Sequence, residues 1–182
     1  VGMANVPAGY QQRIVTQAAC EKCHTANAIP PHSGRNNPNY CVICHNPETE
    51  PGMEMAPFIH RIHAAQDNSL PSGAWTQEGD WSQVGYPQDI KNCDTCHVGT
   101  DALNWKNVPT IQGCTPCHAG LAGTGLDFAT GLGHNTEGAP GAQTNSAGCY
   151  LCHTPTSITA NHADPNTTPT NVSVGADNIA YF

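Results

Sequence analysis

The sequence predicts a mostly irregular fold with short α-helices and minimal β structure, held together by something other than an ordinary apolar core. Leu, Ile, Val and Phe together number 27 of the 182 residues, which is low for a packed domain. Gly contributes 18 residues and Pro 15, and both interrupt regular structure. Yet 10 Cys and 10 His are too many for a disordered polymer, so these residues indicate where the ordering material binds.

The cysteines form five pairs, each with two residues between its members and a histidine directly after it. Such a C-x-x-C-H motif attaches c-type haem, because the two thiols bond to the porphyrin vinyl groups and the adjacent imidazole reaches the iron. The fold class is therefore a multihaem cytochrome c, with short helices around five covalently bound haem c groups. The predicted motifs are Cys20/Cys23/His24, Cys41/Cys44/His45, Cys93/Cys96/His97, Cys114/Cys117/His118 and Cys149/Cys152/His153.

Three other uses of C-x-x-C fit the sequence less well. Zinc sites combine two such pairs around one metal, and five pairs do not divide into twos. A thioredoxin-like dithiol needs one pair within a βαβ pattern, and iron–sulfur clusters take four thiolates with no obligatory histidine. None of these sites explains a histidine after every pair.

The histidines outside the motifs supply one further iron ligand for each haem. If all of them bind, every iron is bis-histidine and six-coordinate, with no open position for a substrate. The alternative is that one or two are structural or surface residues. Met3, Met53 and Met55 are alternative axial ligands, although core packing is the better interpretation for them. The predicted distal ligands are His32, His60, His63, His134 and His162.

His60 and His63 lie in the segment 55–65, which is predicted to be a helix with Pro57 in its first turn. A spacing of three places both rings on one face of a helix. Because each iron already has a proximal histidine, we expect the two to bind different, neighbouring haems. The apolar residues Phe58, Ile59 and Ile62 are available to pack on porphyrin.

The organisation of the chain follows the motifs, whose first cysteines stand at positions 20, 41, 93, 114 and 149. We expect a lead-in segment over 1–19, a pentahaem domain over 20–162 and a C-terminal tail over 163–182. The equal spacing within 20–45 and 93–118 suggests two similar two-haem units. Helices are expected to begin near Thr16, Met55 and Gln88, and the segments 67–88 and 120–147 to be loops.

The two ends of the chain show strand-like residues. The segment 13–16 is predicted to be a short strand, and 171–174 and 179–182 alternate as strands do, with no partner strand evident. An unpaired strand edge predicts pairing with another domain or with a second copy of the chain, and the alternative is a disordered tail.

The segments between the motifs resemble the pentahaem domains of outer-membrane decahaem metal reductases, the OmcA/MtrC family. The resemblance covers about residues 13–153. It rests on a histidine between the first two motifs, on Phe58-Ile-His-Arg-Ile-His63 and on Asn104-Trp-Lys106. It also rests on Tyr40-Cys-Val-Ile-Cys-His-Asn-Pro47 and Gly85-Tyr-Pro-Gln-Asp-Ile-Lys-Asn-Cys93.

The resemblance implies a crossed chain of haems that carries electrons from an outer-membrane conduit to extracellular metal oxides or soluble electron shuttles. Family members join two such domains to two β-barrels, whereas this sequence contains one domain and no recognisable barrel. It is therefore expected to be a piece of a larger protein or a stand-alone relative. Flavin association is not carried over, because no cysteine is spare for the disulfide linked with it.

Charge and export agree with this function. Six Lys and Arg against 14 Asp and Glu give a net charge of −8. This charge excludes nucleic acid as a partner and favours basic proteins or metal cations. The alternative is that the acidic surface simply keeps the protein soluble. No run of 18 apolar residues predicts a transmembrane helix. Because haem is attached to thiols outside the cytoplasm, we expect an exported protein, at the cell surface by resemblance or else in the periplasm, with its leader removed.

Three functions remain as hypotheses. The first is an electron-transfer protein, not an enzyme, that conducts electrons to other cytochromes, metal oxides or shuttles. The second is a subunit of a cytochrome filament that self-associates through its C-terminal tail. The third is a multihaem reductase, which needs one open iron and basic residues around an anion. The available basic residues are Arg13, Lys22, Arg35, Arg61, Lys91 and Lys106.

Overall fold

The computed structural model describes residues 15–24, 37–46, 49, 53–66, 80–99, 101–118, 145–162, 173–174 and 180–181. Within them the chain is irregular and helix-rich, as predicted, and its elements are short. The helices are α1 (Gln17–Cys20), α2 (Pro38–Cys44), α3 (Met55–His63), α4 (Asn104–Asn107), α5 (Ile111–His118), α6 (Cys149–Cys152) and α7 (Pro155–His162). Two 3₁₀ turns, η2 (Cys93–Thr95) and η3 (Asp101–Leu103), and two strands, β1 (Ser173–Val174) and β2 (Ala180–Tyr181), complete the described elements.

Local capping residues begin the first helices. The Thr16 hydroxyl accepts a hydrogen bond from the Ala19 N–H at the start of α1. Asn37 directly precedes Pro38, the first residue of α2, and its side chain accepts a hydrogen bond from the Asn39 N–H. Both residues satisfy backbone donors that a helix start leaves unpaired. The predicted helix starts near Thr16 and at Met55 are confirmed, with Pro57 in the first turn of α3.

The predicted helix start near Gln88 is wrong. Residues 88–92 form a turn, in which the Asp89 carboxylate accepts a hydrogen bond from the Lys91 N–H at 2.9 Å and the Asp89 carbonyl accepts one from Asn92 N–H. An aspartate that bonds the backbone two residues on favours a turn over a continuing helix. The chain then enters the 3₁₀ turn η2.

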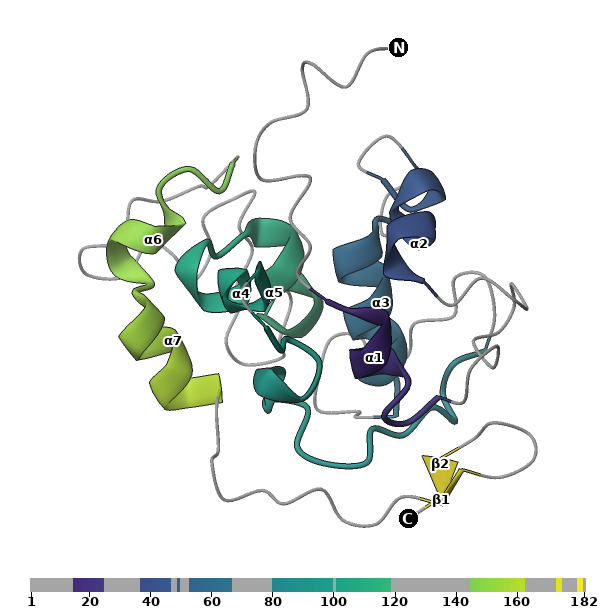
Figure 1. Cartoon of the computed structure of the whole chain (residues 1–182). Helices are drawn as coiled ribbons and strands as arrows, with labels where there is room; N and C mark the ends of the chain where they lie inside the picture. The colour runs from purple at the N-terminus through teal and green to yellow at the C-terminus, as the bar shows by residue number, and fades with distance from the viewer. Residues whose placement is uncertain are drawn as a thin grey trace.

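The helices follow one another across the molecule (Figure 1). In that view α1, α2 and α3 lie on the right, α4 and α5 in the middle, and α6 and α7 on the left. Helix α3 packs chiefly against α5, and α4 packs against α7. Helix α3, which carries His60 and His63, thus lies against α5, which carries the fourth motif.

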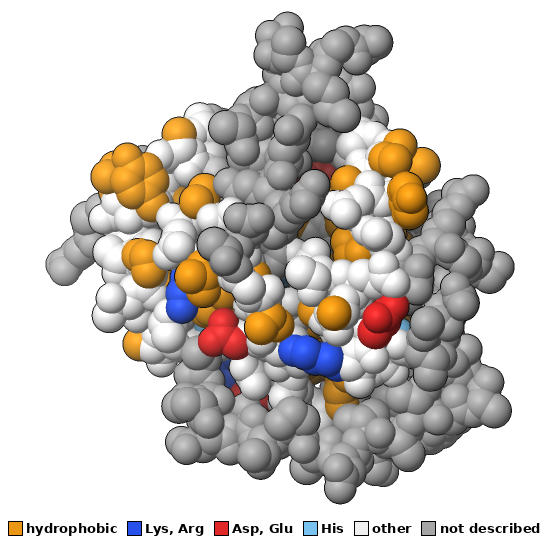
Figure 2. Space-filling model, viewed as in Figure 1, with side chains coloured by type: hydrophobic (Ala, Val, Ile, Leu, Met, Phe, Trp, Pro, Cys, Tyr) orange, Lys and Arg blue, Asp and Glu red, His pale blue; other side chains and the backbone are white. Residues whose placement is uncertain are grey.

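The buried side chains are small. Among the described residues, those classed as buried are only Ala and Pro, namely Ala19, Pro57, Ala64, Ala65, Ala102, Pro109 and Pro116. Several larger apolar side chains are exposed instead, including Ile43 at 66% and Leu151 at 69%. Figure 2 shows apolar side chains scattered over one face, with few charged ones between them. An ordinary domain would bury its Leu, Ile, Val and Phe.

The two C-terminal strands pair with each other. Strands β1 and β2 are antiparallel, with Ser173 opposite Tyr181 and Val174 opposite Ala180. The expectation that these strand segments lack a partner is therefore wrong, because they pair with each other. The pairing was not predicted because the four residues between the segments 171–174 and 179–182 carry no recognised hairpin motif. Pairing of this tail with another domain or subunit stays a prediction.

Several sequence predictions fall on residues outside the described ranges. Residues 13–14 of the predicted N-terminal strand and most of the predicted loops 67–88 and 120–147 are among them. The described part of the first loop, 80–88, is irregular, as predicted. In the described part of the chain, every helix is too short or too polar to cross a membrane.

Candidate haem-binding site

The five C-x-x-C-H motifs share one local geometry. In four of them the histidine N–H donates to the carbonyl of the first cysteine, at 2.8–2.9 Å, and in the fourth motif the residues lie within α5. One helical turn therefore gathers the two thiols and the imidazole of each motif. All ten cysteines are free thiols, so no disulfide competes with attachment.

Burial, together with neighbouring thiols, raises the pKa of cysteines in three of the motifs. The pKa is about 11 for Cys20, about 12 for Cys93 and about 11 for Cys114. The protein surroundings therefore do not activate these thiols, whereas redox-active dithiols have a lowered pKa.

Three motif histidines each face one of the additional histidines. The ring centroids are 6.0 Å apart for His24 and His63 and 6.1 Å apart for His60 and His97. Those of His118 and His162 are 5.7 Å apart, and their Nε2 atoms are 3.5 Å apart. Helix α3 thus directs His63 to the first motif and His60 to the third, while α7 directs His162 to the fourth.

These separations suit an iron between the rings. An imidazole nitrogen binds a transition metal at about 2 Å, so two imidazoles on opposite sides of one iron have bound nitrogens about 4 Å apart and ring centres about 6 Å apart. Direct hydrogen bonding between two rings would bring the nitrogens to about 3 Å. The observed ring-centre separations, 5.7–6.1 Å, match the value expected for two imidazoles on one metal.

Backbone carbonyls orient three of the histidines. The Nδ1 atom of His63 lies 2.9 Å from the Ile59 carbonyl, that of His162 lies 2.9 Å from the Ile158 carbonyl, and that of His45 lies 2.7 Å from the Met53 carbonyl. A proton on Nδ1 leaves the Nε2 lone pair free. Metal-binding histidines commonly use this arrangement.

Burial favours the neutral form of four of these histidines, His24, His60, His63 and His118. It lowers the pKa of His60 to about 4, with further lowering from His97 and His63, and it lowers the pKa of His24 and His63. The pKa of His118 is lowered by burial and then by His162 and His153. The neutral imidazole is the form that binds a metal.

The second motif is joined to the start of α3. The ring of His45 stacks on Phe58, with centroids 4.6 Å apart, and the His45 carbonyl accepts a hydrogen bond from the Met55 N–H at 3.0 Å. Phe58 is predicted to pack on porphyrin, and the structure places its ring on the motif histidine His45. Met53 contributes its backbone carbonyl to the same ring.

Two predicted distal ligands are not placed. His32 and His134 lie outside the described residues, so the structure brings neither to a motif. The motif histidines of the second and fifth sites, His45 and His153, are described, and His153 is exposed.

Thiols from different motifs lie close enough to raise one another's pKa. These electrostatic effects indicate which motifs are neighbours in space. Cys41 of the second motif acts on Cys20 of the first, and Cys96 of the third acts on Cys20 as well. Cys117 of the fourth motif acts on Cys93, and Cys149 of the fifth acts on Cys114. The spatial series is second, first, third, fourth, fifth.

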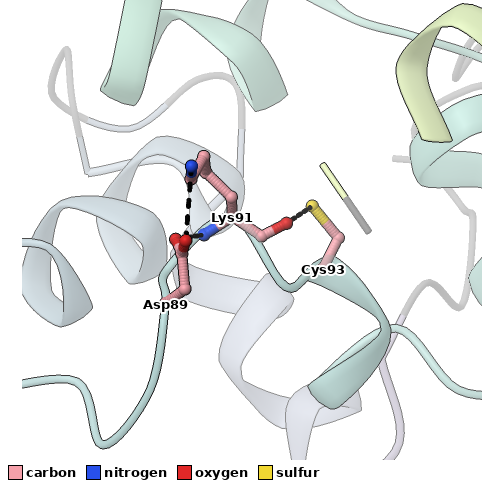
Figure 3. A network of polar contacts seen from close by, with 3 residues as sticks. All are labelled: Asp89, Lys91 and Cys93. Carbon is pink, nitrogen blue, oxygen red and sulfur yellow. Dashed lines mark hydrogen bonds and ion pairs between the residues drawn. The ribbon is translucent and has the colours of Figure 1, made fainter. Parts of the chain in front are cut away.

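Polar contacts join the first and third motifs directly. The Lys22 Nζ atom, between Cys20 and Cys23, donates to the Thr95 carbonyl, between Cys93 and Cys96, at 2.7 Å. Figure 3 shows the turn that leads into the third motif, where Asp89 pairs with Lys91 Nζ at 3.3 Å and the Cys93 thiol donates to the Lys91 carbonyl at 3.4 Å.

No role was predicted from the sequence for Tyr86 and Gln88, which lie beside the contact between the first and third motifs. Tyr86 contacts both His63 and Cys96, and Gln88 contacts Tyr86 and Thr95. A cavity of about 520 Å³ adjoins His63, Tyr86, Gln88 and Lys91. Lys22 is a cation within a C-x-x-C pair. It is a feature of the sequence that could have predicted a contact between motifs.

The residues present fit covalently bound haem. The motifs supply two thiols and an imidazole on one turn, facing imidazoles supply a second ligand at suitable spacing, and the small Ala and Pro core suits a chain organised around large porphyrins.

Comparison with known proteins also indicates a multihaem cytochrome. A family model described as outer membrane cytochrome MtrC/MtrF-like, domains II/IV, matches residues 12–163. The crystal structure of MtrC from Shewanella baltica OS185 matches with a TM-score of 0.58 and 26% identity, over 89% of this chain and 23% of that one. The chain therefore spans about a quarter of the length of that relative. No curated protein matches.

Proposed function

Because the chain belongs to the family of MtrC/MtrF-like outer-membrane cytochromes, domains II/IV, we propose that it conducts electrons through five closely spaced bis-histidine haems. Membership makes it an exported, outer-membrane multihaem electron-transfer protein with covalently bound c-type haem. The number of haems, their ligands and the acceptor are the finer parts of the proposal.

One observation carries the proposal: histidines from α3 and α7 face three motif histidines at the spacing that an iron between two imidazoles requires. On this basis His24 and His63 hold the first iron, His97 and His60 the third, and His118 and His162 the fourth. His45 and His153 hold the second and fifth irons, with His32 and His134 as their distal ligands. All ten cysteines form thioethers.

Haem supplies one-electron chemistry, in which iron cycles between its ferric and ferrous forms. On this proposal two histidines of the chain would hold each iron, which would leave no position for a substrate to bind. The chain also holds the motifs in series, with the second and fifth at the ends. Electrons would therefore enter and leave near the second and fifth sites.

The partners follow from location and charge. We propose that electrons arrive from other cytochromes and pass to extracellular metal oxides or soluble shuttles by outer-sphere transfer, without a catalytic pocket. The net charge of −8 favours metal cations and basic partners at the surface.

The deciding experiment is low-temperature electron paramagnetic resonance (EPR) of the oxidised, haem-loaded protein, together with its mass and visible spectrum. We expect a mass increase of five haems, low-spin signals from all five irons, no ready binding of cyanide by the oxidised protein and only slow binding of carbon monoxide by the reduced protein. A high-spin iron that binds either ligand would instead favour a reductase with one open site.

A further inference from the structure

Tyr86 is the side chain that contacts both the first and the third site. Its ring meets the ring of His63 edge-on, with centroids 6.0 Å apart and planes at 86°. Its hydroxyl lies 3.8 Å from the Cys96 sulfur. His63 faces His24 of the first motif, while Cys96 belongs to the third motif, so one residue lies between two sites.

The hydrogen bonds around Tyr86 leave its hydroxyl proton available for Cys96. The Gln88 side-chain N–H₂ donates to the Tyr86 oxygen at 3.3 Å and also donates to the Thr95 hydroxyl. The Gln88 carbonyl in turn accepts from the Asn92 side chain at 3.3 Å, which sets the orientation of the amide. With its oxygen acting as acceptor for Gln88, the phenol has its own proton available for Cys96.

Attachment of haem makes this direction obligatory. A thioether sulfur has no proton and acts only as a weak acceptor, so the phenol must be the donor. A tyrosine hydroxyl is protonated at neutral pH. A hydrogen-bond donor that points at the edge of a haem would favour the reduced form of that haem, which is richer in electrons.

The His63 ring is held from two sides. Its Nδ1 atom lies 2.9 Å from the Ile59 carbonyl, and the Tyr86 ring lies edge-on against it. The Lys22–Thr95 hydrogen bond keeps the first and third motifs together beside this contact. Loss of the Tyr86 ring would free His63 to rotate about the bond to its iron.

We propose that Tyr86 is a positioning residue that sets the properties of two sites at once: its ring fixes the plane of His63, and its hydroxyl donates a hydrogen bond to the Cys96 thioether. The inference rests on the proposed function, because it takes His63 as an iron ligand and Cys96 as an attachment residue.

The test compares Tyr86→Phe and Tyr86→Leu in the haem-loaded protein by EPR and by a spectroelectrochemical titration of all the haems. The Phe variant should keep every low-spin signal and lower the reduction equilibrium constant of one haem by roughly threefold, since a hydrogen bond to a weak acceptor contributes modestly. The Leu variant should also change the low-spin g-values of a second haem.

Tyr40→Phe and Tyr40→Leu are matched controls, because Tyr40 lies next to a motif but is 62% exposed. They should leave potentials and g-values unchanged. If the Tyr86 variants behave like the Tyr40 variants, the inference is wrong. If Tyr86→Leu fails to take up haem, the Phe variant decides alone, because a purely structural role would not shift one potential. A high-spin iron in the unaltered protein would instead overturn the proposed function.

Discussion

His60 and His63 show how much depends on a spacing of three residues. The pair lies on one turn of α3, yet His60 faces His97 and His63 faces His24. Both side chains are half-buried, and loss of solvent around them lowers the pKa of each. A single helical turn therefore provides ligands to two irons on the proposed assignment.

Alanine substitutions at these positions should produce separate and additive effects. We expect His60→Ala and His63→Ala each to convert one low-spin haem to high-spin, and the double variant to convert two, because each histidine serves a different iron. EPR spin quantification measures this. Arg61→Ala, between the two histidines, is the control and should convert none. One high-spin haem in the double variant would mean that both histidines serve the same iron.

At the level of elements, α7 is held by its cap more than by burial. Its residues are exposed or half-buried, and Thr154 precedes it. The Thr154 hydroxyl accepts a hydrogen bond from the Ser157 N–H at 3.3 Å, and the Thr154 carbonyl accepts one from Ile158 N–H at 3.0 Å. The far end of the same helix carries His162, which faces His118.

Thr154→Ala should therefore weaken the ligand at the other end of the helix. Loss of an N-cap costs about 1 kcal/mol, which corresponds to roughly a fivefold rise in the fraction of α7 that is open. We expect carbon monoxide to bind the reduced fourth haem about that much faster, as followed by stopped flow. Thr156→Ala, an exposed position in the same helix, should leave the rate unchanged; equal rates in both variants would contradict the argument.

The elements also show what a single sequence can and cannot predict. Helix α3 was predictable because Pro57 and the spacing of His60 and His63 are local features. The facing of His63 and His24 depends on contacts between distant segments, which spacing does not encode. The helix expected near Gln88 failed because Asp89 caps a turn. Tyr86 lies in a segment that carries the family resemblance, but no role was predicted for it because a lone aromatic residue in a loop forms no pattern.

At the scale of the whole molecule, charge is the property that an incoming partner meets first. The chain carries a net charge of −8, and its haem propionates would add to it. The field of such a protein attracts cations and repels anions over roughly a Debye length, which is about 30 Å at 10 mM salt and about 8 Å at 150 mM.

Electron exchange with small mediators should follow this charge. We expect the reduced protein to transfer electrons to a cationic metal complex faster at low salt, with the rate falling by roughly an order of magnitude between about 10 and 150 mM. An anionic complex of similar potential should show the opposite salt dependence. Rates that do not change with salt for either complex would mean that the exposed haem edges lie away from the acidic surface.

The position of α3 in the chain also bears on how the protein matures. The helix follows the first two motifs and precedes the third, and its two histidines face His24, which is already synthesised, and His97, which is not. On the proposed assignment, His63 can find its iron once the first motif is loaded, whereas His60 must wait until residues beyond it are exported and modified. Final folding of the central region is therefore tied to the order in which the motifs are loaded during secretion.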